Sequence, residues 1–571
     1  MLELEETEDE SAFLLKDEFV ERYAHVRDRY FSRNAEYWPI FKEPGLAHII
    51  ECREQDIRKT PDERLEIYPK GSELYSRIQA INEVEKDGVD PSVEHDPMLL
   101  FAGALGKNWE DPSSVENVVT MPSDPAIYGS MVGILSNPNL AYKEYCDKAD
   151  DLEKYVIRQM ASLAGYDPDK ATGIFTQGGT FCNLYGYLLG IRKNMPNARA
   201  FGLGSEKDYR FINSKGGHYS NTTNLSLLGV DLKRRTIRIK VTKNNKIDVK
   251  DFELQLESCF RLQSCVPTIM LTMGTTDTFG VDEVRPVYEI RERLCERYDI
   301  KDVPHIHVDA AIGWSMLFFL NYDFEKNPLH INDVTLHGLE RNVALFKQIK
   351  YSDSYTIDFH KWGYVPYTSS LIVIKDKNDV RALENDPENF SYFEDDQQGA
   401  THLTATIECS RGAIGMFGAY AGLRYLGVEG YQAVLAHCLQ NANYFRHRLH
   451  EFAGVQVLVY QNQGPSVAFR IYNPDVIISA EDEYEYEHNY QHCDDYHERI
   501  RRNSKFHRDI FLRRGKMGLF TNWVEYIAHT THDEKDRHCY IPGEKAVFMN
   551  PRTSFEDIDR FLSNLLADKT G

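Results

Sequence analysis

Short apolar runs rich in β-branched residues alternate with longer amphipathic segments between about residues 150 and 375. This alternation predicts βαβ units and a largely parallel sheet buried between helices. Helical patterns occupy the gaps, for example at residues 181–193 and 284–298. The predicted strands are residues 171–176, 236–242, 266–272, 303–310 and 369–374.

The patterns on either side of this region predict two further parts. Charged helical stretches and proline-containing loops before residue 110 predict an N-terminal helical wrapping segment. Residues 411–426 form an apolar pattern that predicts a long helix ending at Gly427 and leading into a smaller domain. Within that domain, residues 481–502 are dense in charge and tyrosine, which favours a solvated helix or loop. The expected divisions are residues 1–110, 111–430 and 431–571.

Composition excludes several classes of function. The chain has 571 residues, and 66 basic against 88 acidic side chains give a formal charge of −22. Such a charge disfavours a nucleic acid or an anionic membrane as partner. The N-terminal residues lack the pattern of a secretory signal, and no apolar run is long enough to span a membrane. We therefore expect a cytoplasmic protein.

Ten cysteines are present, without a Cys-x-x-Cys pair or a short disulfide framework. Reduced thiols are the expected state. Cys493 lies among His488, His492 and His497, but a solvated loop explains this cluster more simply than a metal site does. No metal is expected.

The most informative segment is residues 354–367, where Asp358, His360 and Lys361 interrupt an apolar run between predicted strands. A lysine at a strand end, desolvated and beside an imidazole, is suited to Schiff-base formation. The alternative is that Lys361 only extends its charged end into solvent, and this segment taken alone favours that alternative.

Two further segments weaken the alternative. Asp309 ends an apolar strand, where an open α/β sheet binds its ligand, and a carboxylate there can pair with a pyridinium nitrogen. Gly178, Gly179 and Thr180 lie between a predicted strand and an apolar helix. The two glycines let the backbone approach an anion closely, Thr180 supplies a hydroxyl, and the helix N-terminus adds N–H donors. Together they predict a phosphate site. The segment matches neither a Walker loop nor a dinucleotide fingerprint.

Two more candidates complete the set. His218 follows a Gly-Gly turn and could lie over a planar ring, and Thr276 belongs to a run of small polar residues after another strand. In chain order the five segments supply a phosphate site, a stacking imidazole, a hydroxyl, a pyridinium partner and a Schiff-base lysine. Together they predict a pyridoxal phosphate site.

The order and the sequences of these motifs resemble those of the group II pyridoxal-phosphate-dependent amino acid decarboxylases over roughly residues 120–430. Residues 122–128, 137–145 and 356–367 are most similar to bacterial tyrosine decarboxylases. The resemblance implies a type I, aminotransferase-like α/β fold, with a mainly parallel seven-stranded sheet and a smaller α+β C-terminal domain. It also implies pyridoxal 5'-phosphate as cofactor and an obligate homodimer with sites at the interface.

The resemblance assigns roles to individual residues. Lys361 is the lysine that bonds the cofactor, Asp309 pairs with the pyridine nitrogen, and His218 stacks on the ring. Tyr367 is the expected substrate-binding residue. The remaining cofactor-binding positions are Gly178, Gly179, Thr180, Thr276, Ala311 and His360.

The chain also departs from the family pattern. Many relatives have asparagine at the position of Asp358, and many have a carboxylate-binding arginine where this chain has Ala546. Lys545 or Arg552 could replace that arginine, although the two side chains bind carboxylates differently.

The family's mobile loop carries a tyrosine that protonates the product carbanion. The candidates in this chain are Tyr392, which is slightly preferred, and His402.

The predicted activity is α-decarboxylation of an L-amino acid, releasing CO₂ and an amine, with tyrosine or a related aromatic amino acid as the leading substrate. Aspartate and glutamate stay open as substrates. An aldehyde-forming reaction or C–C cleavage by the same fold stays open as well. A non-enzymatic scaffold is disfavoured because all five site segments are present.

Overall fold

The computed structural model describes residues 10–58, 83, 84, 86, 107–141, 143–205, 208–384, 405–489, 493–515, 518–529 and 540–565. By internal contacts the chain forms two compact units. Unit 1 comprises Met1–Arg22, Pro125–Asn443 and Val459–Ser466, and unit 2 comprises Tyr23–Asp124, Tyr444–Leu458 and Val467–Gly571. The domain boundaries expected from the sequence, near residues 110 and 430, stay predictions.

Unit 1 contains a seven-stranded sheet in the order β1-β7-β6-β5-β4-β2-β3. β7 is antiparallel to both its neighbours, and the other paired strands are parallel. The four strands β4 to β7 are buried along their whole length, as expected for a sheet covered on both faces. The bounds are β1 Thr172–Thr176, β2 Phe211–Ser214, β3 Thr236–Ile239, β4 Thr268–Thr272, β5 His305–Asp309, β6 Ser354–Asp358 and β7 Ser370–Ile374.

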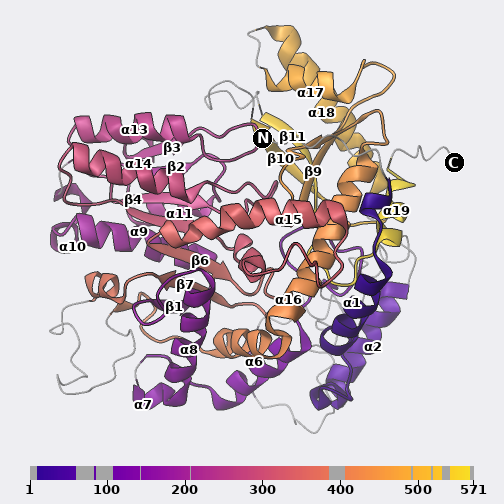
Figure 1. Ribbon diagram of the computed structural model, residues 1–571, viewed down its shortest axis with the longest axis horizontal. Helices are drawn as coiled ribbons and strands as arrows, with labels where there is room; N and C mark the ends of the chain where they lie inside the picture. The colour runs from indigo at the N-terminus through magenta and orange to yellow at the C-terminus, as the bar shows by residue number, and fades with distance from the viewer. Residues whose placement is uncertain are drawn as a thin grey trace. The chain divides into compact units, whose positions relative to one another are not determined.

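This sheet confirms the predicted α/β fold with a mainly parallel seven-stranded sheet. Figure 1 shows helices on both sides of the strands. Strands β2 and β6 were not among the predicted strands. The helices of unit 1 are α6 Asp124–Ser136, α7 Lys143–Cys146, α8 Lys148–Leu163, α9 Gly179–Asn194, α10 Ala198–Phe201, α11 Ser220–Leu227, α12 Leu232–Arg235, α13 Val249–Arg261, α14 Val284–Arg297, α15 Asp333–Phe346 and the first part of α16 Ile414–Leu449.

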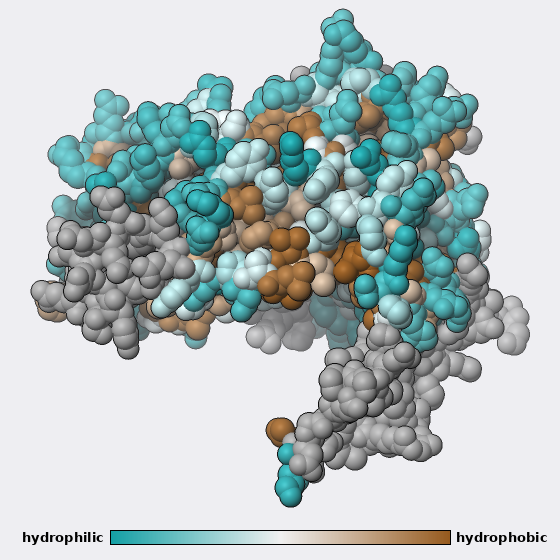
Figure 2. Space-filling model, turned by 90° about the horizontal axis from the view of Figure 1, so that it is seen from below, coloured by the Kyte–Doolittle hydropathy of each residue, from teal (hydrophilic) through white to brown (hydrophobic). Residues whose placement is uncertain are grey.

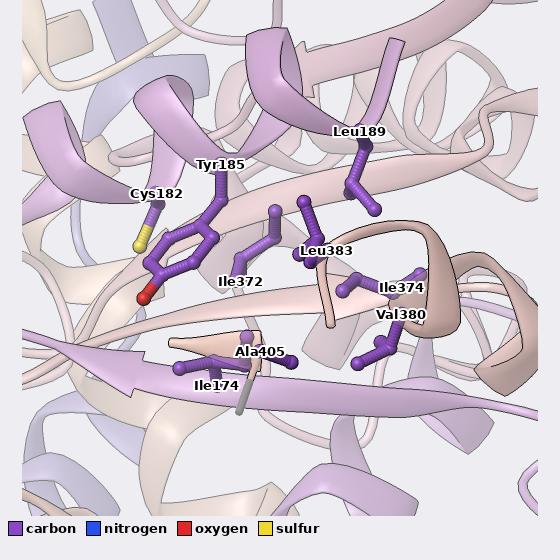
Figure 3. Packing of buried hydrophobic residues seen from close by; sticks show 9 residues of the cluster. All are labelled: Ile174, Cys182, Tyr185, Leu189, Ile372, Ile374, Val380, Leu383 and Ala405. Carbon is purple, nitrogen blue, oxygen red and sulfur yellow. The ribbon is translucent and has the colours of Figure 1, made fainter. Parts of the chain in front are cut away.

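Helix α9 lies across the sheet and contacts β1 and the four strands β4 to β7. One of its faces carries Cys182, Tyr185 and Leu189, which are spaced so that they point the same way. Figure 3 shows these side chains packed against apolar residues of β1 and β7. The cluster is completed by Ile174, Ile372, Ile374, Val380, Leu383 and Ala405. Burial of this face fixes the position of the helix start, where the candidate phosphate site lies.

Glycine allows α9 to approach the sheet closely at Gly190. A Cβ atom there would lie 2.1 Å from Thr268 Oγ1 and 2.4 Å from the backbone oxygen of Pro267. The carbonyl cannot move without disturbing the start of β4, so the contact requires glycine.

We therefore expect Gly190→Ala to lower the free energy of unfolding by about 1–3 kcal/mol, because the added methyl group overpacks the interface. The matched control is Gly204→Ala, where a Cβ atom meets nothing within 4 Å. Urea denaturation followed by circular dichroism measures both. Unchanged or higher stability of Gly190→Ala would contradict the close packing, since alanine otherwise favours a helix by about 1 kcal/mol.

The long helix α16 is interrupted where the sequence predicted a helix end. Gly427 has φ 62° and ψ −175°, which is not a helical conformation. A positive φ is readily adopted by glycine, and glycine commonly ends helices in this way. The chain then resumes a helical path to Leu449.

Unit 2 contains a four-stranded sheet in the order β10-β11-β9-β8, together with helices. This confirms the predicted α+β character of the smaller part. The strands are β8 Val455–Leu458, β9 Ser466–Ile471, β10 Asn522–His529 and β11 Tyr540–Val547. Its helices are most of α1 Asp17–Tyr30, then α2 Pro44–Arg58, α17 Ala480–His488, α18 Asp494–Arg514 and α19 Phe555–Leu562.

The described residues of segment 481–502 lie mostly in α17 and α18, where the sequence had favoured a helix or a loop, but the prediction that the segment is only solvated is wrong. Glu487 is fully buried and accepts hydrogen bonds from Arg470 Nε at 2.7 Å and Nη2 at 2.8 Å. The Tyr472 hydroxyl donates to the same carboxylate at 2.9 Å. A buried carboxylate is retained when a cation and further donors surround it, and Arg470 comes from β9, distant in sequence.

Within the described ranges, no helix combines the length and the apolar character needed to cross a membrane. The described cysteines are free thiols. Among described residues, no three histidine, cysteine, aspartate or glutamate side chains are arranged to hold a metal ion. His492, one member of the cluster around Cys493, lies outside the described residues.

Candidate active site

The candidate site residues lie at one edge of the unit 1 sheet. In the paired register, the last residue of β4, Thr272, is opposite Asp309 at the end of β5. Across the antiparallel β7, Ser370 pairs with both Asp358, the last residue of β6, and Thr176, the last residue of β1. The carboxyl ends of β1, β4, β5 and β6 therefore meet at the same edge, which is where open α/β sheets bind ligands.

Lys361 follows β6 and pairs with a carboxylate on the same turn. Its Nζ lies 2.7 Å from Asp358 Oδ2, and its side chain is only 16% exposed. Burial favours the neutral amine, but Asp358 and Asp309 outweigh burial and raise the pKa of Lys361 above its ordinary value. Lys361 is therefore an ion-paired ammonium in this arrangement.

Asp309 is buried at the end of β5 and held by two donors. Asn183 Nδ2 of α9 donates to Asp309 Oδ2 at 2.8 Å, and the backbone N–H of Ala311 donates to Oδ1 at 3.2 Å. These bonds fix the orientation of the carboxylate at the strand end. An oriented, buried carboxylate suits pairing with a protonated ring nitrogen.

A network of buried polar side chains supports Asp309 from behind. His307 Nδ1 lies 2.7 Å from Ser354 Oγ, and His307 Nε2 lies 2.9 Å from Thr356 Oγ1. The Thr356 hydroxyl donates to Asn183 Oδ1 at 2.9 Å, which completes the path to Asp309. Burial lowers the pKa of His307 well below its ordinary value, so the imidazole is neutral.

Sequence reasoning assigned no role to these supporting residues. The sequence feature that could have identified them is the alternation His305-Ile-His307 in β5. It places two histidines on one face of an otherwise apolar strand.

Helix α9 begins at Gly179, with Gly178 in the N-cap position. A Cβ atom on Gly178 would meet nothing within 4 Å, whereas one on Gly179 would lie 2.7 Å from Asp358 Oδ2. Asn224 Nδ2 donates to the backbone oxygen of Thr180 at 2.8 Å and fastens the first turn. The N–H groups at the start of such a helix favour an anion.

His218 belongs to the same charge cluster. Burial lowers the pKa of its imidazole, while the nearby carboxylate of Asp309 opposes that effect. The backbone N–H of Ser220 donates to His218 Nδ1 at 3.2 Å, and the Tyr219 ring lies 4.1 Å away between centroids. The structure therefore brings His218, Asp309 and Lys361 together.

His360 and Tyr367 lie beside the lysine. The His360 Nδ1 atom is 2.9 Å from the Ser369 carbonyl oxygen, and its ring centroid is 4.0 Å from that of Tyr367. Tyr367 is 55% exposed. A cavity of about 220 Å³ opens beside it, lined partly by Thr176, Gln177 and Thr368. Tyr367 therefore faces space that a small ligand could use.

The other predicted positions are less informative. Thr276 is half-buried in the loop after β4, and its carbonyl accepts a hydrogen bond from Ser466 Oγ at 2.9 Å. Ala546 and Lys545 are buried in β11 of unit 2. The roles considered for these residues stay predictions. Tyr392 and His402 lie outside the described residues.

The residues at the sheet edge fit pyridoxal phosphate. Lys361 supplies an amine, Asp309 supplies a fixed carboxylate, and His218 supplies a neutral imidazole in the same cluster. The unobstructed Gly178 backbone at the start of α9 suits a phosphate.

Comparison with known proteins agrees with this fit. Residues 100–472 match the pyridoxal-dependent decarboxylase conserved domain. The chain belongs to the pyridoxal-dependent decarboxylase family. The family predicted from the motifs is therefore confirmed, together with its cofactor. The more specific likeness to tyrosine decarboxylases stays a prediction.

Curated relatives of this family member include decarboxylases of different amino acids. The chain is 24% identical over 333 residues to L-2,4-diaminobutyrate decarboxylase of Acinetobacter baumannii, covering 56% of this chain and 59% of the relative. It is 22% identical over 409 residues to aspartate 1-decarboxylase of Aliivibrio fischeri, covering 65% of this chain and 68% of the relative. The matches thus span about three fifths to two thirds of these relatives.

The fold is shared with solved structures of the family. The crystal structure of Oryza sativa TDC with PLP and tryptamine superposes with a TM-score of 0.68 at 14% identity, covering 96% of this chain and 97% of that one. At this identity the likeness concerns the fold alone.

Proposed function

We propose that the protein is a pyridoxal-phosphate-dependent α-decarboxylase of L-amino acids, releasing CO₂ and the corresponding amine. The observation that carries the proposal is the placement of Lys361 and Asp309 at one sheet edge, beside the start of α9. Family membership supports the same activity. The proposed cofactor-binding set is Gly178, Gly179, Thr180, His218, Thr276, Asp309, Ala311, His360 and Lys361.

Pyridoxal phosphate, when bound, supplies an aldehyde for an amino group and a pyridinium ring that accepts the electron pair of the broken Cα–carboxylate bond. Lys361 would hold the cofactor through its Nζ, as the amine at this sheet edge that is placed for it. Asp309 holds a proton at the pyridine nitrogen, and the bonds from Asn183 and Ala311 keep its carboxylate aligned.

His218 would stack on the ring as a neutral group, because burial lowers the pKa of its imidazole. A neutral imidazole adds no second positive charge beside Lys361. Tyr367 contributes to the substrate side, where its ring borders the cavity. Tyr392 or His402 would return a proton to the substrate's Cα.

For the substrate we propose tyrosine or a related aromatic amino acid. The support is the amino-acid sequence of three segments, which is most similar to bacterial tyrosine decarboxylases. The segments are residues 122–128, 137–145 and 356–367. The curated relatives favour a second candidate, a charged amino acid such as aspartate or 2,4-diaminobutyrate.

The test is CO₂ release by the purified protein with added cofactor, measured for the twenty common amino acids and 2,4-diaminobutyrate. We expect tyrosine to give a kcat/KM at least about tenfold above that of aspartate, which corresponds to about 1.4 kcal/mol of discrimination. A preference for aspartate or diaminobutyrate would reject the aromatic assignment. Absence of CO₂ release from every amino acid, or aldehyde and peroxide as the products, would reject the decarboxylase proposal.

We also propose that the protein acts as a homodimer in the cytoplasm. Helix α6 exposes Tyr128, Val132, Ile134 and Leu135, and Ile414 of the neighbouring α16 is 44% exposed. Figure 2, seen from below the view of Figure 1, shows apolar side chains gathered on one face. Exposed apolar groups of this kind favour an interface with another protein surface.

A further inference from the structure

The ion pair between Lys361 and Asp358 is built into the fold. Asp358 ends β6, its side chain is 2% exposed, and its Oδ2 lies 2.7 Å from Lys361 Nζ. The Ser370 hydroxyl of β7 donates to Oδ1 at 2.5 Å, so both carboxylate oxygens are engaged. The carboxylate is therefore fixed by Ser370 of β7 and by Lys361, and it cannot turn away from the lysine without losing the bond to Ser370.

The start of α9 further stabilises the negative charge of Asp358. Both carboxylate oxygens lie beside the Gly179 backbone. They are 2.7 and 2.8 Å from the position that a Cβ atom on residue 179 would occupy. The N-terminal end of a helix carries a partial positive charge that favours an anion. Burial disfavours the ionised carboxyl, but Lys361 and His360 hold its pKa below the ordinary value.

Asp309 does not replace Asp358 as the direct partner of the lysine. Its oxygens accept hydrogen bonds from Asn183 and from the backbone of Ala311. Other titratable groups of this cluster within the described residues include His218, His360 and Tyr367, and Asp277 acts on His218. Neither imidazole carries a negative charge, and Tyr367 is neutral at neutral pH because the ordinary pKa of a phenol is about 10 and that of Tyr367 is raised further.

We propose that Asp358 is a positioning residue that holds Lys361 as an ion-paired ammonium until the cofactor enters, and thereby sets the pH at which the protein takes up pyridoxal phosphate. The inference rests on the proposed use of the cofactor but not on any substrate. Lys361 bonds to the aldehyde carbon only as the neutral amine. Its ammonium therefore first gives a proton to water, and the aldehyde oxygen leaves as water when the C=N bond forms.

The test is the rate of pyridoxal phosphate uptake by protein freed of cofactor, followed by absorbance from pH 6 to pH 10. Asp358→Asn keeps the size of the side chain and removes its charge. We expect uptake by this variant at neutral pH to be about tenfold faster, because loss of an opposite charge lowers an amine pKa by about one unit or more. The uptake profile should shift to lower pH, and pyridoxal without its phosphate should show the same shift.

The matched control is Asp379→Asn. Lys193 Nζ and Asp379 Oδ2 form a pair of similar length, 2.8 Å, elsewhere in unit 1. This variant should keep the parental uptake profile. An Asp358→Asn profile identical to the parent, or slower uptake at neutral pH, would overturn the proposal.

A second measurement does not depend on folding of the variant. Labelling of Lys361 by an amine-reactive reagent in the cofactor-free parent, located by peptide mapping, gives the pH at which its amine becomes free. We expect that midpoint to lie above the ordinary lysine value of about 10.4. A midpoint at or below that value would overturn the proposal even if the protein decarboxylates amino acids. Correct uptake behaviour without decarboxylation would instead reject only the proposed activity.

Discussion

Lys361→Ala should reduce decarboxylation by at least about 10⁴-fold and remove the visible absorbance of the covalently held cofactor. Lys361 is the described lysine that joins the charge cluster of Asp309 and His218 at the sheet edge. Loss of its amine removes the group that holds the cofactor and passes it to the substrate. Steady-state kinetics and the absorbance spectrum of the purified variant measure both effects.

Lys375→Ala is the control for this variant. Lys375 follows β7 of the same sheet, and its Nζ donates to the Lys350 carbonyl at 2.7 Å, so it has a structural partner. This control should keep the absorbance and most of the activity. Borohydride reduction of the parent followed by peptide mapping should label Lys361. Labelling at Lys215 or Lys375 instead would show that the site is wrongly assigned.

Asp309→Asn should leave a folded protein that binds the cofactor but turns over about 10³-fold more slowly. The amide has nearly the size of the carboxylate, so packing against Asn183 is little changed. A neutral amide cannot hold the pyridine nitrogen protonated, and the ring then accepts electrons poorly. Cofactor content by absorbance and kcat under saturating substrate separate binding from chemistry.

Asp282→Asn provides a matched change at a second buried carboxylate, in the loop after β4. Asp282 accepts a hydrogen bond from the Thr272 backbone at 2.8 Å at the end of β4. This variant should lose stability rather than kcat per bound cofactor, since its carboxylate serves the backbone. If Asp309→Asn kept the parental kcat, as the Asp282→Asn control should, the carboxylate of Asp309 would be structural. That result would reject its proposed role at the pyridine nitrogen.

Local sequence patterns were sufficient for much of the fold. The five predicted strands all correspond to strands of the sheet, because their apolar β-branched runs are bounded by turns. The sequence predicted a helix end at Gly427; the helix is interrupted there, with a φ of 62° that glycine adopts without strain, but it continues to Leu449. Strand β6 was missed since Ser354, Thr356 and Asp358 break its apolar pattern.

The motifs also placed the candidate chemistry. Asp309 was identified because an acidic residue is unusual at the end of an apolar strand, Lys361 because it interrupts an apolar run beside a histidine, and Gly178–Gly179 because a helix follows directly. These are properties of residues close together in the chain. The sequence therefore determined the family and the cofactor, and it singled out the candidate site residues, whose roles stay predictions.

Only the tertiary structure decided which of these residues meet. The order of the strands brings the ends of β1, β5 and β6 to one edge, and thereby joins Asn183 of α9 to Asp309. Likewise, the buried Glu487 of a charge-rich segment finds Arg470 on a distant strand. Burial takes both charges out of water, so the pair is retained only where geometry and further hydrogen bonds offset that cost, and burial depends on contacts between residues far apart in the chain, which local patterns do not encode.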